Sequence, residues 1–301
     1  MKIDPPSSFP VYACPYSQRL AALSPRFARQ VYPQRSRLSA PPSIDGQAQL
    51  GQYSIDPFGE LTHASKVKGL KQRFPDRVLI MTTEHCFMNC RHCTRQGLFG
   101  KTEIVETAAD LKACLRYVKS HPLVRDVLLS GGDILTLPDA QVLKFVDAFA
   151  ALEQIDIVRV CTRAPCTNPP RITKRLAKAL GRSKKVWVNT QFNCADEVTP
   201  AARKAAALLV EAGIPVSCQS VLLKGVNDTP EEMLKLLQAL SAARIRPYYV
   251  FMCDPILGID HFRVSRRRAK AIEKYCAESI GGLALPRFVM DVPGAKRKLP
   301  I

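Results

Sequence analysis

Long apolar runs, acidic residues and aromatic residues are all scarce in this chain of 301 residues. No apolar stretch approaches the roughly 20 residues that a helix needs to span a bilayer, which argues against a membrane protein. The first residues, Met1 to Pro6, contain no apolar segment of the kind found in secretory signals. Aromatic residues make up only 7% of the chain, and no aromatic-rich module for binding RNA is visible. These absences favour a cytoplasmic globular protein.

The shortage of acidic residues leaves the chain strongly basic, because 26 Asp and Glu face 44 Lys and Arg for a net charge of +18. Such a charge favours an acidic partner, which could be nucleic acid, a phosphorylated cofactor or an acidic redox protein. A basic surface without a dedicated partner is the alternative. Hydrophobic residues at 47% and charged residues at 23% are ordinary for a globular protein, so most of the chain is expected to fold.

From residue 77 onward, apolar runs with the length of buried strands alternate with amphipathic segments. Residues 1–70 are instead rich in Pro, Ser and Gln, and short helices are expected there only around Arg19–Ala28. We expect strands over 78–82, 126–130, 157–161, 185–189, 216–221, 248–252 and 287–290, and helices over 107–120, 138–152, 171–180, 199–212, 229–242 and 264–279. This alternation predicts βα units with a parallel sheet.

Six βα units are too few for a closed ring of eight. The fold class expected is therefore α/β, a partial, open (β/α)6 barrel over residues 71–301 with an irregular N-terminal extension over residues 1–70. In such a barrel the reactive groups gather at the carboxyl ends of the strands.

Of the eleven cysteines, only Cys86, Cys90 and Cys93 have the spacing of ligands. A reducing compartment would not keep disulfides, so most of the others are interpreted as core thiols. The C-x3-C-x2-C array follows the first predicted strand, and its soft thiolates favour an iron–sulfur cluster or zinc. Three thiolates would hold three irons of a [4Fe–4S] cluster and leave the fourth iron open. A structural zinc site needs four ligands, for which His92 would have to serve.

The cysteine array resembles the signature of the radical S-adenosylmethionine (SAM) superfamily. A second motif, Ser130-Gly131-Gly132-Asp133, ends the next predicted strand and resembles the GGE-type motif of that family. The resemblance implies that the open iron binds the amino and carboxylate groups of SAM, and that one-electron reduction cleaves SAM to a 5′-deoxyadenosyl radical. The glycines would let the backbone approach SAM, and the acidic residue suits its ammonium group.

Roughly residues 70–301 more narrowly resemble the lysine 2,3-aminomutase family. The matching segments, in order and with compatible spacings, are 73–77, 90–95, 126–133, 189–193, 219–228, 253–254 with 261–263, and 291–294 with 298–300. The family pairs SAM with pyridoxal 5′-phosphate (PLP). The resemblance identifies Lys298 as the lysine that anchors PLP covalently, with its neighbour Lys296 as the alternative. Arg73 and Arg77 correspond to the arginines on the PLP phosphate, an anion that guanidinium groups match well.

The same resemblance assigns Arg95 to the substrate carboxylate, and Asp254 and Asp291 to the distal ammonium group of lysine. Two carboxylates from neighbouring strand ends repel each other unless a cation lies between them. A site with these charges at its two ends would select an amino acid with a cationic side chain, and glutamate-specific relatives lack the acidic pair. The structural alternative is that Asp254 caps a helix and Asp291 pairs with an arginine. His92 and Gln219 are expected to contact a cofactor.

The implied reaction is a 2,3-amino migration that converts L-lysine to β-lysine. The alternatives are the same chemistry on arginine, ornithine or another amino acid, or on lysine for modification of elongation factor P. A radical SAM enzyme that modifies RNA and a non-catalytic iron–sulfur or zinc protein are the alternatives from other classes. No zinc site is carried over from the family.

An acidic flavodoxin or ferredoxin is the expected electron donor, and the basic segment Arg266–Lys270 is a candidate docking surface. Neither a membrane nor nucleic acid is expected as a partner, and a homo-oligomer is left open. Gln191 and Cys194 depart from the family pattern, which commonly has histidine at both positions. The segment 293–298 is bulkier and more charged than the glycine-rich run of the family. The resemblance therefore indicates the cofactors more strongly than it indicates the substrate.

Overall fold

The computed structural model describes residues 9–33, 56, 59–60, 65–256, 258–292 and 295–301. The expected N-terminal extension over 1–70 therefore lies only partly within the described residues, and its boundary stays a prediction. All residues predicted to form the site are described.

A single sheet of nine strands forms the centre of the molecule, in the spatial order β1 to β9. The strands are β1 (Leu70–Phe74), β2 (Arg77–Thr83), β3 (Asp126–Gly131), β4 (Ile157–Cys161), β5 (Val186–Thr190), β6 (Val216–Leu222), β7 (Arg246–Met252), β8 (Arg287–Met290) and β9 (Leu299–Pro300). Strands β2 to β8 are parallel, whereas β1 and β9 are the antiparallel edges. Because β1 and β9 do not pair, the sheet formed by the described strands stays open, and the predicted partial barrel is confirmed.

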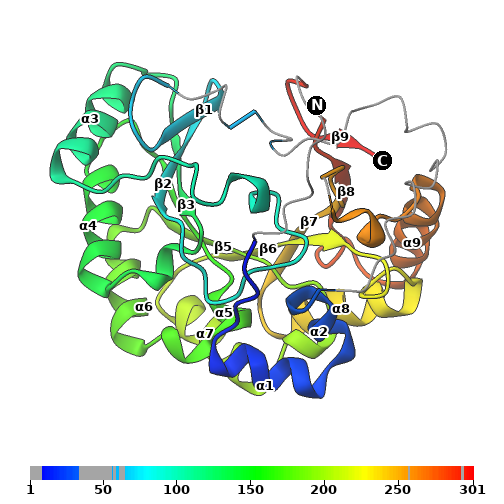
Figure 1. The fold of residues 1–301 in the computed structure, drawn as a ribbon. Helices are drawn as coiled ribbons and strands as arrows, with labels where there is room; N and C mark the ends of the chain where they lie inside the picture. The colour runs from blue at the N-terminus through cyan, green and yellow to red at the C-terminus, as the bar shows by residue number, and fades with distance from the viewer. Residues whose placement is uncertain (1–8, 34–55, 57–58, 61–64, 257, 293–294) are drawn as a thin grey trace.

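Helices cover the convex side of this sheet. They are α3 (Ala108–Lys119), α4 (Asp139–Ala150), α5 (Ala164–Thr167), α6 (Lys174–Leu180), α7 (Pro200–Glu211), α8 (Pro230–Ala242) and α9 (Arg266–Ser279). Figure 1 shows the longer of these helices as an outer layer around the curved strands. Two N-terminal helices, α1 (Pro15–Leu23) and α2 (Pro25–Val31), lie at the bottom of the same view.

Hydroxyl side chains fix where most of the helices begin. The Thr107 side chain accepts a bond from the Asp110 amide, and the Asp110 side chain bonds back to the Thr107 amide at the start of α3. Thr173, Thr199 and Thr229 accept the corresponding amide bond before α6, α7 and α8. Each such cap contributes about 1 kcal/mol of helix stability. The capping residues therefore set the lengths of the loops that reach the carboxyl ends of the strands.

Side chains alternate between the two faces of the sheet. In β4, Val158 and Val160 are fully buried on the helix side, while Ile157 and Arg159 line a cavity of about 460 Å³ on the concave side. The concave side of the barrel is therefore hollow and accessible, which leaves room for ligands inside the curve of the sheet.

Every strand expected from the sequence is present within two residues of its predicted ends. The helix expected over 171–180 begins only at Lys174, because residues Pro169–Arg171 first form a 3₁₀ turn. The short helices expected around 19–28 are α1 and α2, which meet at Ser24. The edge strands β1 and β9 were not anticipated.

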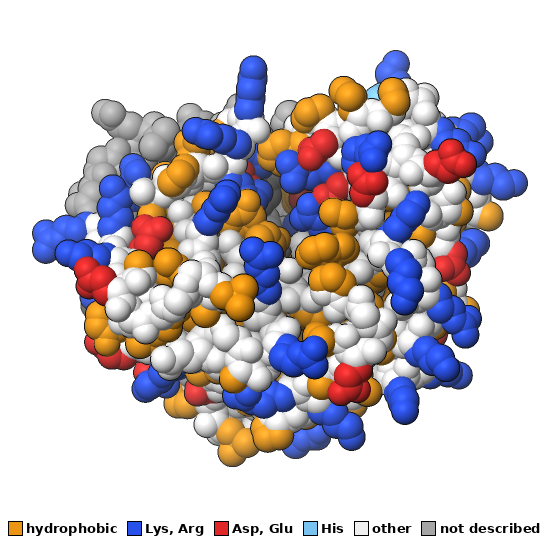
Figure 2. All heavy atoms as spheres, turned by 180° about the vertical axis from the view of Figure 1, so that it is seen from behind, with side chains coloured by type: hydrophobic (Ala, Val, Ile, Leu, Met, Phe, Trp, Pro, Cys, Tyr) orange, Lys and Arg blue, Asp and Glu red, His pale blue; other side chains and the backbone are white. Residues whose placement is uncertain are grey.

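Lysine and arginine side chains dominate the charged groups on the face seen in Figure 2, in keeping with the net charge of +18. None of the described helices combines the length and the apolar character needed to cross a membrane.

Candidate active site

The cysteine array lies on the loop that leaves β2 at its carboxyl end, residues 84–95, called the cluster loop below. Cys86, Cys90 and Cys93 are all partly exposed on it. Burial and the neighbouring Cys93 raise the pKa of the Cys86 thiol, and burial and Cys90 raise that of Cys93 to about 11. The thiols are therefore close enough to influence one another, and Cys86 and Cys93 would lose their protons at neutral pH only on binding a metal.

Residues 9–14 run alongside the cluster loop and fix its backbone. The Cys14 amide donates to the Phe87 carbonyl and the Asn89 amide donates to the Tyr12 carbonyl, both at 2.8 Å. Among the described residues, no three His, Cys, Asp or Glu side chains converge on a single ion. A [4Fe–4S] cluster needs no such convergence, because it binds each cysteine through a separate iron. Three neighbouring thiols on one fixed loop therefore fit a cluster.

A buried arginine faces the array from the loop after β4. Nη1 of Arg163 lies 2.9 Å from Sγ of Cys90, and its Nη2 lies 3.3 Å from Oε2 of Glu197. Burial alone would lower the pKa of Arg163, but Cys90, Cys166 and Glu197 raise it well above its usual value. The guanidinium is therefore a fixed positive charge beside the cluster loop.

Gly131 and Gly132 let the end of β3 come against the cluster loop. Gly131 has a φ of +123°, and a Cβ atom there would lie 2.2 Å from the Thr83 carbonyl oxygen. A Cβ atom on Gly132 would lie 2.2 Å from the His85 carbonyl oxygen. Only glycine allows such an approach, so the motif is needed for the fold. Its expected contact with SAM stays a prediction.

The side chain of Asp133 is used inside the fold. Its Oδ1 accepts bonds from the Thr162 hydroxyl at 2.6 Å and the Leu135 amide at 3.0 Å. Its Oδ2 accepts from the Arg163 amide at 2.9 Å. Burial raises the pKa of this carboxyl even though these bonds favour its ionised form. The carboxyl joins the loops that follow β3 and β4, so in this geometry it is a positioning group rather than a free ligand for an ammonium.

Arg95 is held by a carboxylate of the chain itself. Its Nε lies 2.8 and 3.1 Å from the two oxygens of Glu60, and its Nη2 lies 2.8 Å from Oε1. Its Nη1 donates to the Gly131 carbonyl at 2.9 Å and lies 3.5 Å from Oγ of Ser130. Burial would raise the pKa of Glu60, but Arg95 lowers it. A guest carboxylate would have to share the guanidinium with Glu60 or replace it.

Lys298 and the two predicted aspartates meet beyond the ends of β7 and β8. Nζ of Lys298 lies 3.2 Å from Oδ2 of Asp291, and Nη2 of Arg73 lies 2.9 Å from Oδ1. Burial and the neighbouring Asp291 raise the pKa of Asp254 to about 7. The structure therefore brings Asp254, Asp291, Lys298 and Arg73 together. The pairing of Asp291 with an arginine, expected as the structural alternative, is present as well.

Three cations surround the ring of Phe74. The guanidinium carbons of Arg73 and Arg77 lie 5.2 and 4.4 Å from the ring centroid, and Nζ of Lys298 lies 5.7 Å from it. Arg77 also pairs with Asp76 at 3.1 Å. Like charges gathered this closely favour an anion among them. A lysine and two arginines around one ring offer an amine for an aldehyde and cations for a phosphate, so these residues fit PLP.

His92 is fully enclosed, and its Nε2 lies 3.1 Å from Nε2 of Gln191 and 3.2 Å from Nδ2 of Asn193. Both neighbours are amide donors, so Nε2 accepts and Nδ1 carries the hydrogen. Burial lowers the pKa of His92 well below its usual value. Nδ1 is buried without a hydrogen-bond partner among the described residues, which is the kind of group that a bound ligand satisfies.

Gln219 lies on the concave side of β6. Its Oε1 accepts a bond from the Tyr248 hydroxyl at 3.0 Å, and that hydroxyl lies 3.2 Å from Nδ2 of Asn189. Its expected contact with a cofactor stays a prediction.

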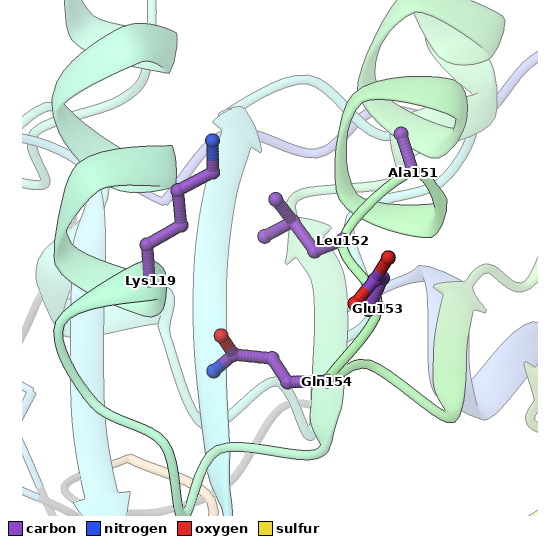
Figure 3. Close-up of a pocket in the computed structure, with 5 residues that line it drawn as sticks. All are labelled: Lys119, Ala151, Leu152, Glu153 and Gln154. Atoms are coloured by element: carbon purple, nitrogen blue, oxygen red, sulfur yellow. The ribbon is translucent and has the colours of Figure 1, made fainter.

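A separate hollow lies at the opposite ends of the strands. Figure 3 shows it between the end of α3 and the loop that leads from α4 to β4, lined by Lys119, Ala151, Leu152, Glu153 and Gln154. The Gln154 amide donates to the Val118 and His121 carbonyls at 2.9 and 3.1 Å. This side chain ties two loops together, and no predicted site residue lines the hollow.

Comparison with known proteins identifies the family of the chain. Residues 80–237 match the family model described as the radical SAM superfamily. The L-lysine 2,3-aminomutase of Fusobacterium nucleatum is 38% identical over 88% of this chain and 62% of the relative. A relative from Aquifex aeolicus, which bears the same name provisionally, is 36% identical over 88% of this chain and 72% of the relative. The chain belongs to the lysine 2,3-aminomutase family of the radical SAM superfamily.

The lysine 2,3-aminomutase family includes more than one specificity among the similar proteins. The glutamate 2,3-aminomutase of Clostridioides difficile is 33% identical over 88% of this chain and 62% of the relative. The chain spans between 57% and 62% of the length of three lysine 2,3-aminomutases that it matches. Radical SAM proteins carry a [4Fe–4S] cluster and bind SAM, which agrees with the fit of the cysteine array.

Solved structures with low sequence identity share the fold. SuiB of Streptococcus suis, bound to S-adenosylmethionine, has a TM-score of 0.53 with 16% identity and covers 72% of this chain and 51% of its own. A radical SAM methyltransferase from Sphaerobacter thermophilus has a TM-score of 0.51 with 17% identity, over 75% of this chain and 70% of its own. The lysine 2,3-aminomutase family therefore uses the open barrel seen in other radical SAM proteins.

Two residues of the site were not anticipated. Glu60 lies in a segment without periodic apolar residues, so the sequence carries no signal for it. Arg163 lies two residues after Cys161, the last residue of β4, and a charged side chain just past the carboxyl end of a barrel strand is the signal that could have identified it.

Proposed function

We propose that this protein is a radical SAM, PLP-dependent amino acid 2,3-aminomutase that acts on L-lysine. The observation that carries the proposal is the grouping of Lys298, Arg73, Asp254 and Asp291 in one place, on the same barrel as a cysteine array suited to a cluster. The lysine 2,3-aminomutase relatives support the same reaction class.

Lys298 and the two arginines of the β1–β2 hairpin are the proposed PLP site. When bound, PLP supplies the conjugated system through which an amino group can migrate. Lys298 would supply the amine that anchors PLP, and Asp291, whose Oδ2 accepts a hydrogen bond from its Nζ at 3.2 Å, fixes the position of that nitrogen. Arg73 and Arg77 neutralise the phosphate, and Phe74 between them keeps water from one side of the site.

The substrate specificity rests on Asp254. Burial and Asp291 disfavour the charge of the Asp254 carboxyl and raise its pKa to about 7, so it is only partly ionised at neutral pH. A cationic side chain from the substrate would restore that charge, because an opposite charge a few ångströms away favours the ionised form. Lysine meets this requirement, and arginine or ornithine would meet it too. A glutamate side chain would add a third carboxylate and be rejected.

The carboxylate end of the substrate is assigned to Arg95. Glu60 bonds to Nε and Nη2 and the Gly131 carbonyl bonds to Nη1, so these two groups fix the plane of the guanidinium. The substrate carboxylate would share Arg95 with Glu60 or replace it. SAM, the substrate and PLP would then bind at the same carboxyl-end side of the barrel, where the protein can hold the reacting carbons at contact distance.

The PLP assignment is tested by trapping. Protein reconstituted without oxygen from iron, sulfide and PLP is reduced with borohydride, and the pyridoxyl adduct is located by peptide mass spectrometry. We expect the adduct on Lys298, its loss in Lys298→Ala, and its retention in the matched control Lys296→Ala. Full PLP occupancy with the adduct at another lysine would refute the assignment. A panel of amino acids with SAM and dithionite then identifies the substrate.

Two further features belong to this proposal. The electron for SAM cleavage is assigned to an acidic flavodoxin or ferredoxin, because a chain with a net charge of +18 attracts such a partner. The exposed side chains of the Arg266–Lys270 segment are the candidate contact. A cytoplasmic location suits thiols and a cluster that need a reducing environment.

A further inference from the structure

Arg163 is a fixed cation beside the cysteine array, and the proposed reaction assigns it no task. Its Nη1 lies 2.9 Å from Sγ of Cys90. Its Nε donates to the Gln191 carbonyl at 3.2 Å, and its Nη2 lies 3.2 Å from Oε1 of Gln30 and 3.3 Å from Oε2 of Glu197. Its Nη2 also lies 3.7 Å from Sγ of Cys166. These five partners hold the guanidinium in one orientation.

Among the described residues, only Glu197 places a carboxylate against the positive charge of the Arg163 guanidinium. The side chain of Glu197 has no exposed surface and that of Arg163 keeps 11%, so both charges are largely removed from water. A buried cation is costly unless anions face it. Glu197 supplies one anion at Nη2, and the sulfur of Cys90 is the group that faces Nη1. A guanidinium N–H aimed at a ligand sulfur is a charge-assisted donor to whatever negative charge that sulfur carries.

We propose that Arg163 sets the reduction potential of the cluster by donating a hydrogen bond from Nη1 to the Cys90 sulfur. The step concerned is the gain of one electron by the [4Fe–4S]2+ cluster to give [4Fe–4S]+, with the electron supplied by an external low-potential reductant and no proton transferred. The added negative charge spreads onto the cysteine sulfurs, so a fixed cation and N–H donor stabilise the reduced form more than the oxidised form. Hydrogen bonds to cluster sulfurs are among the factors that set such potentials.

The inference rests on the cluster ligands of the proposed function, but not on PLP or on the substrate. A purely structural role is the competing explanation, since the ion pair with Glu197 also ties the loop after β4 to the loop after β5. The two explanations differ in one measurable quantity. A structural arginine changes stability without changing the potential of a cluster that still assembles, whereas a tuning arginine changes the potential.

The test is a redox titration of the reconstituted protein followed by the electron paramagnetic resonance signal of the reduced cluster, with and without SAM. Arg163→Gln removes the charge, and Arg163→Lys keeps the charge but shortens the reach. Arg171→Gln is the matched control, because Arg171 also follows β4 but bonds to the Leu135 and Leu137 carbonyls and to Asp139.

We expect the ratio of reduced to oxidised cluster at a fixed solution potential to fall at least tenfold in Arg163→Gln, a shift of about 59 mV toward more negative potential. Arg163→Lys should shift in the same direction by less, and Arg171→Gln should change the ratio less than twofold. A potential in Arg163→Gln equal to that of the unchanged protein would overturn the proposal.

If Arg163→Gln takes up no iron, the reduction potential of the cluster in Arg163→Lys is the test, and a potential equal to that of the unchanged protein would overturn the proposal. Loss of iron from both variants with an unchanged thermal unfolding curve of the metal-free protein would support a direct contact with Cys90. Loss of iron together with loss of the fold would assign Arg163 to structure and overturn the proposal. A reduced cluster signal missing from the unchanged protein would count against the proposed function instead.

Discussion

At the scale of single residues, the candidate site is built from charges that the protein only partly neutralises. Asp291 meets both Lys298 and Arg73, whereas no direct hydrogen bond or ion pair to the Asp254 side chain is found among the described residues. Asp254 is therefore the carboxyl whose protonation most depends on what occupies the site.

Asp254→Asn is expected to stabilise the PLP-free protein at high pH. A raised pKa means that the folded protein keeps a proton that the unfolded chain releases, so the contribution of Asp254 to the unfolding free energy falls as pH rises from about 4 to about 7. At about 1.4 kcal/mol per pKa unit, the variant should gain about 2–4 kcal/mol at pH 8 and distinctly less at pH 5. Urea unfolding at several pH values checks this, and an equal difference at pH 5 and pH 8 would contradict it.

The sequence was informative for residues whose partners lie close by or whose spacing is chemically distinctive. The cysteine array follows from its spacing, and Lys298 with its two aspartates follows from a family resemblance. The roles of Glu60 and Arg163 could not be predicted from the sequence, because their contacts with Arg95 and Cys90 join positions 35 and 73 residues apart in the chain. Pairings of this kind depend on tertiary packing, which a single sequence does not encode in any local pattern.

At the scale of elements, the junction of β3 with the cluster loop is the most demanding part of the fold. The backbone at Gly132 approaches the His85 carbonyl so closely that no Cβ atom fits without a shift of one of the two chains. The junction fixes the cluster loop relative to the sheet, so its geometry should control how well the loop holds iron.

Gly132→Ala should therefore lower both stability and iron content. Overpacking at a rigid contact typically costs about 1–3 kcal/mol. Gly281→Ala is the matched control, because a Cβ atom there meets no heavy atom within 4 Å, and its effect should stay within about 0.5 kcal/mol. Urea unfolding and an iron assay after reconstitution measure both quantities. A Gly132→Ala protein as stable and as rich in iron as the control would refute the steric explanation.

Elements with a clear apolar period were predicted well, and short edge elements were not. Residues 287–290 were predicted as a strand and form β8 with the same ends. Leu70–Phe74 forms β1 although only its first two residues are buried, so the burial pattern that identifies inner strands is missing there. Leu299–Pro300 forms β9 with two residues, which is too short for any pattern.

At the scale of the whole molecule, the excess of 18 positive charges should govern how fast a negatively charged protein reaches the cluster. Figure 2 shows lysine and arginine spread over one face rather than gathered in a single stripe. Charge spread in this way steers acidic proteins toward the surface, and added salt screens it because the Debye length falls to about 8 Å at physiological ionic strength.

Reduction of the cluster by an acidic flavodoxin should accordingly slow several-fold as the salt concentration rises from about 20 to 200 mM. Stopped-flow absorbance of the cluster measures the rate, and a small photoreduced deazaflavin serves as the control reductant whose rate should change little. Reversing the charge of Arg267 and Lys270 should slow the flavodoxin reaction if α9 is the contact. A flavodoxin rate that is insensitive to salt would exclude steering by charge.

Arg73 and Lys298 reach Asp291 from opposite edges of the open sheet, one from β1 and the other from the segment that leads into β9. Two ion pairs that share Asp291, rather than backbone hydrogen bonds between strands, therefore connect the two edges of the open barrel. A deletion series that trims the carboxyl end would break these ion pairs and remove the proposed PLP lysine at the same time. Loss of activity in a shortened protein could then come from the missing lysine or from separation of the two sheet edges. Single substitutions at position 298 separate these two causes.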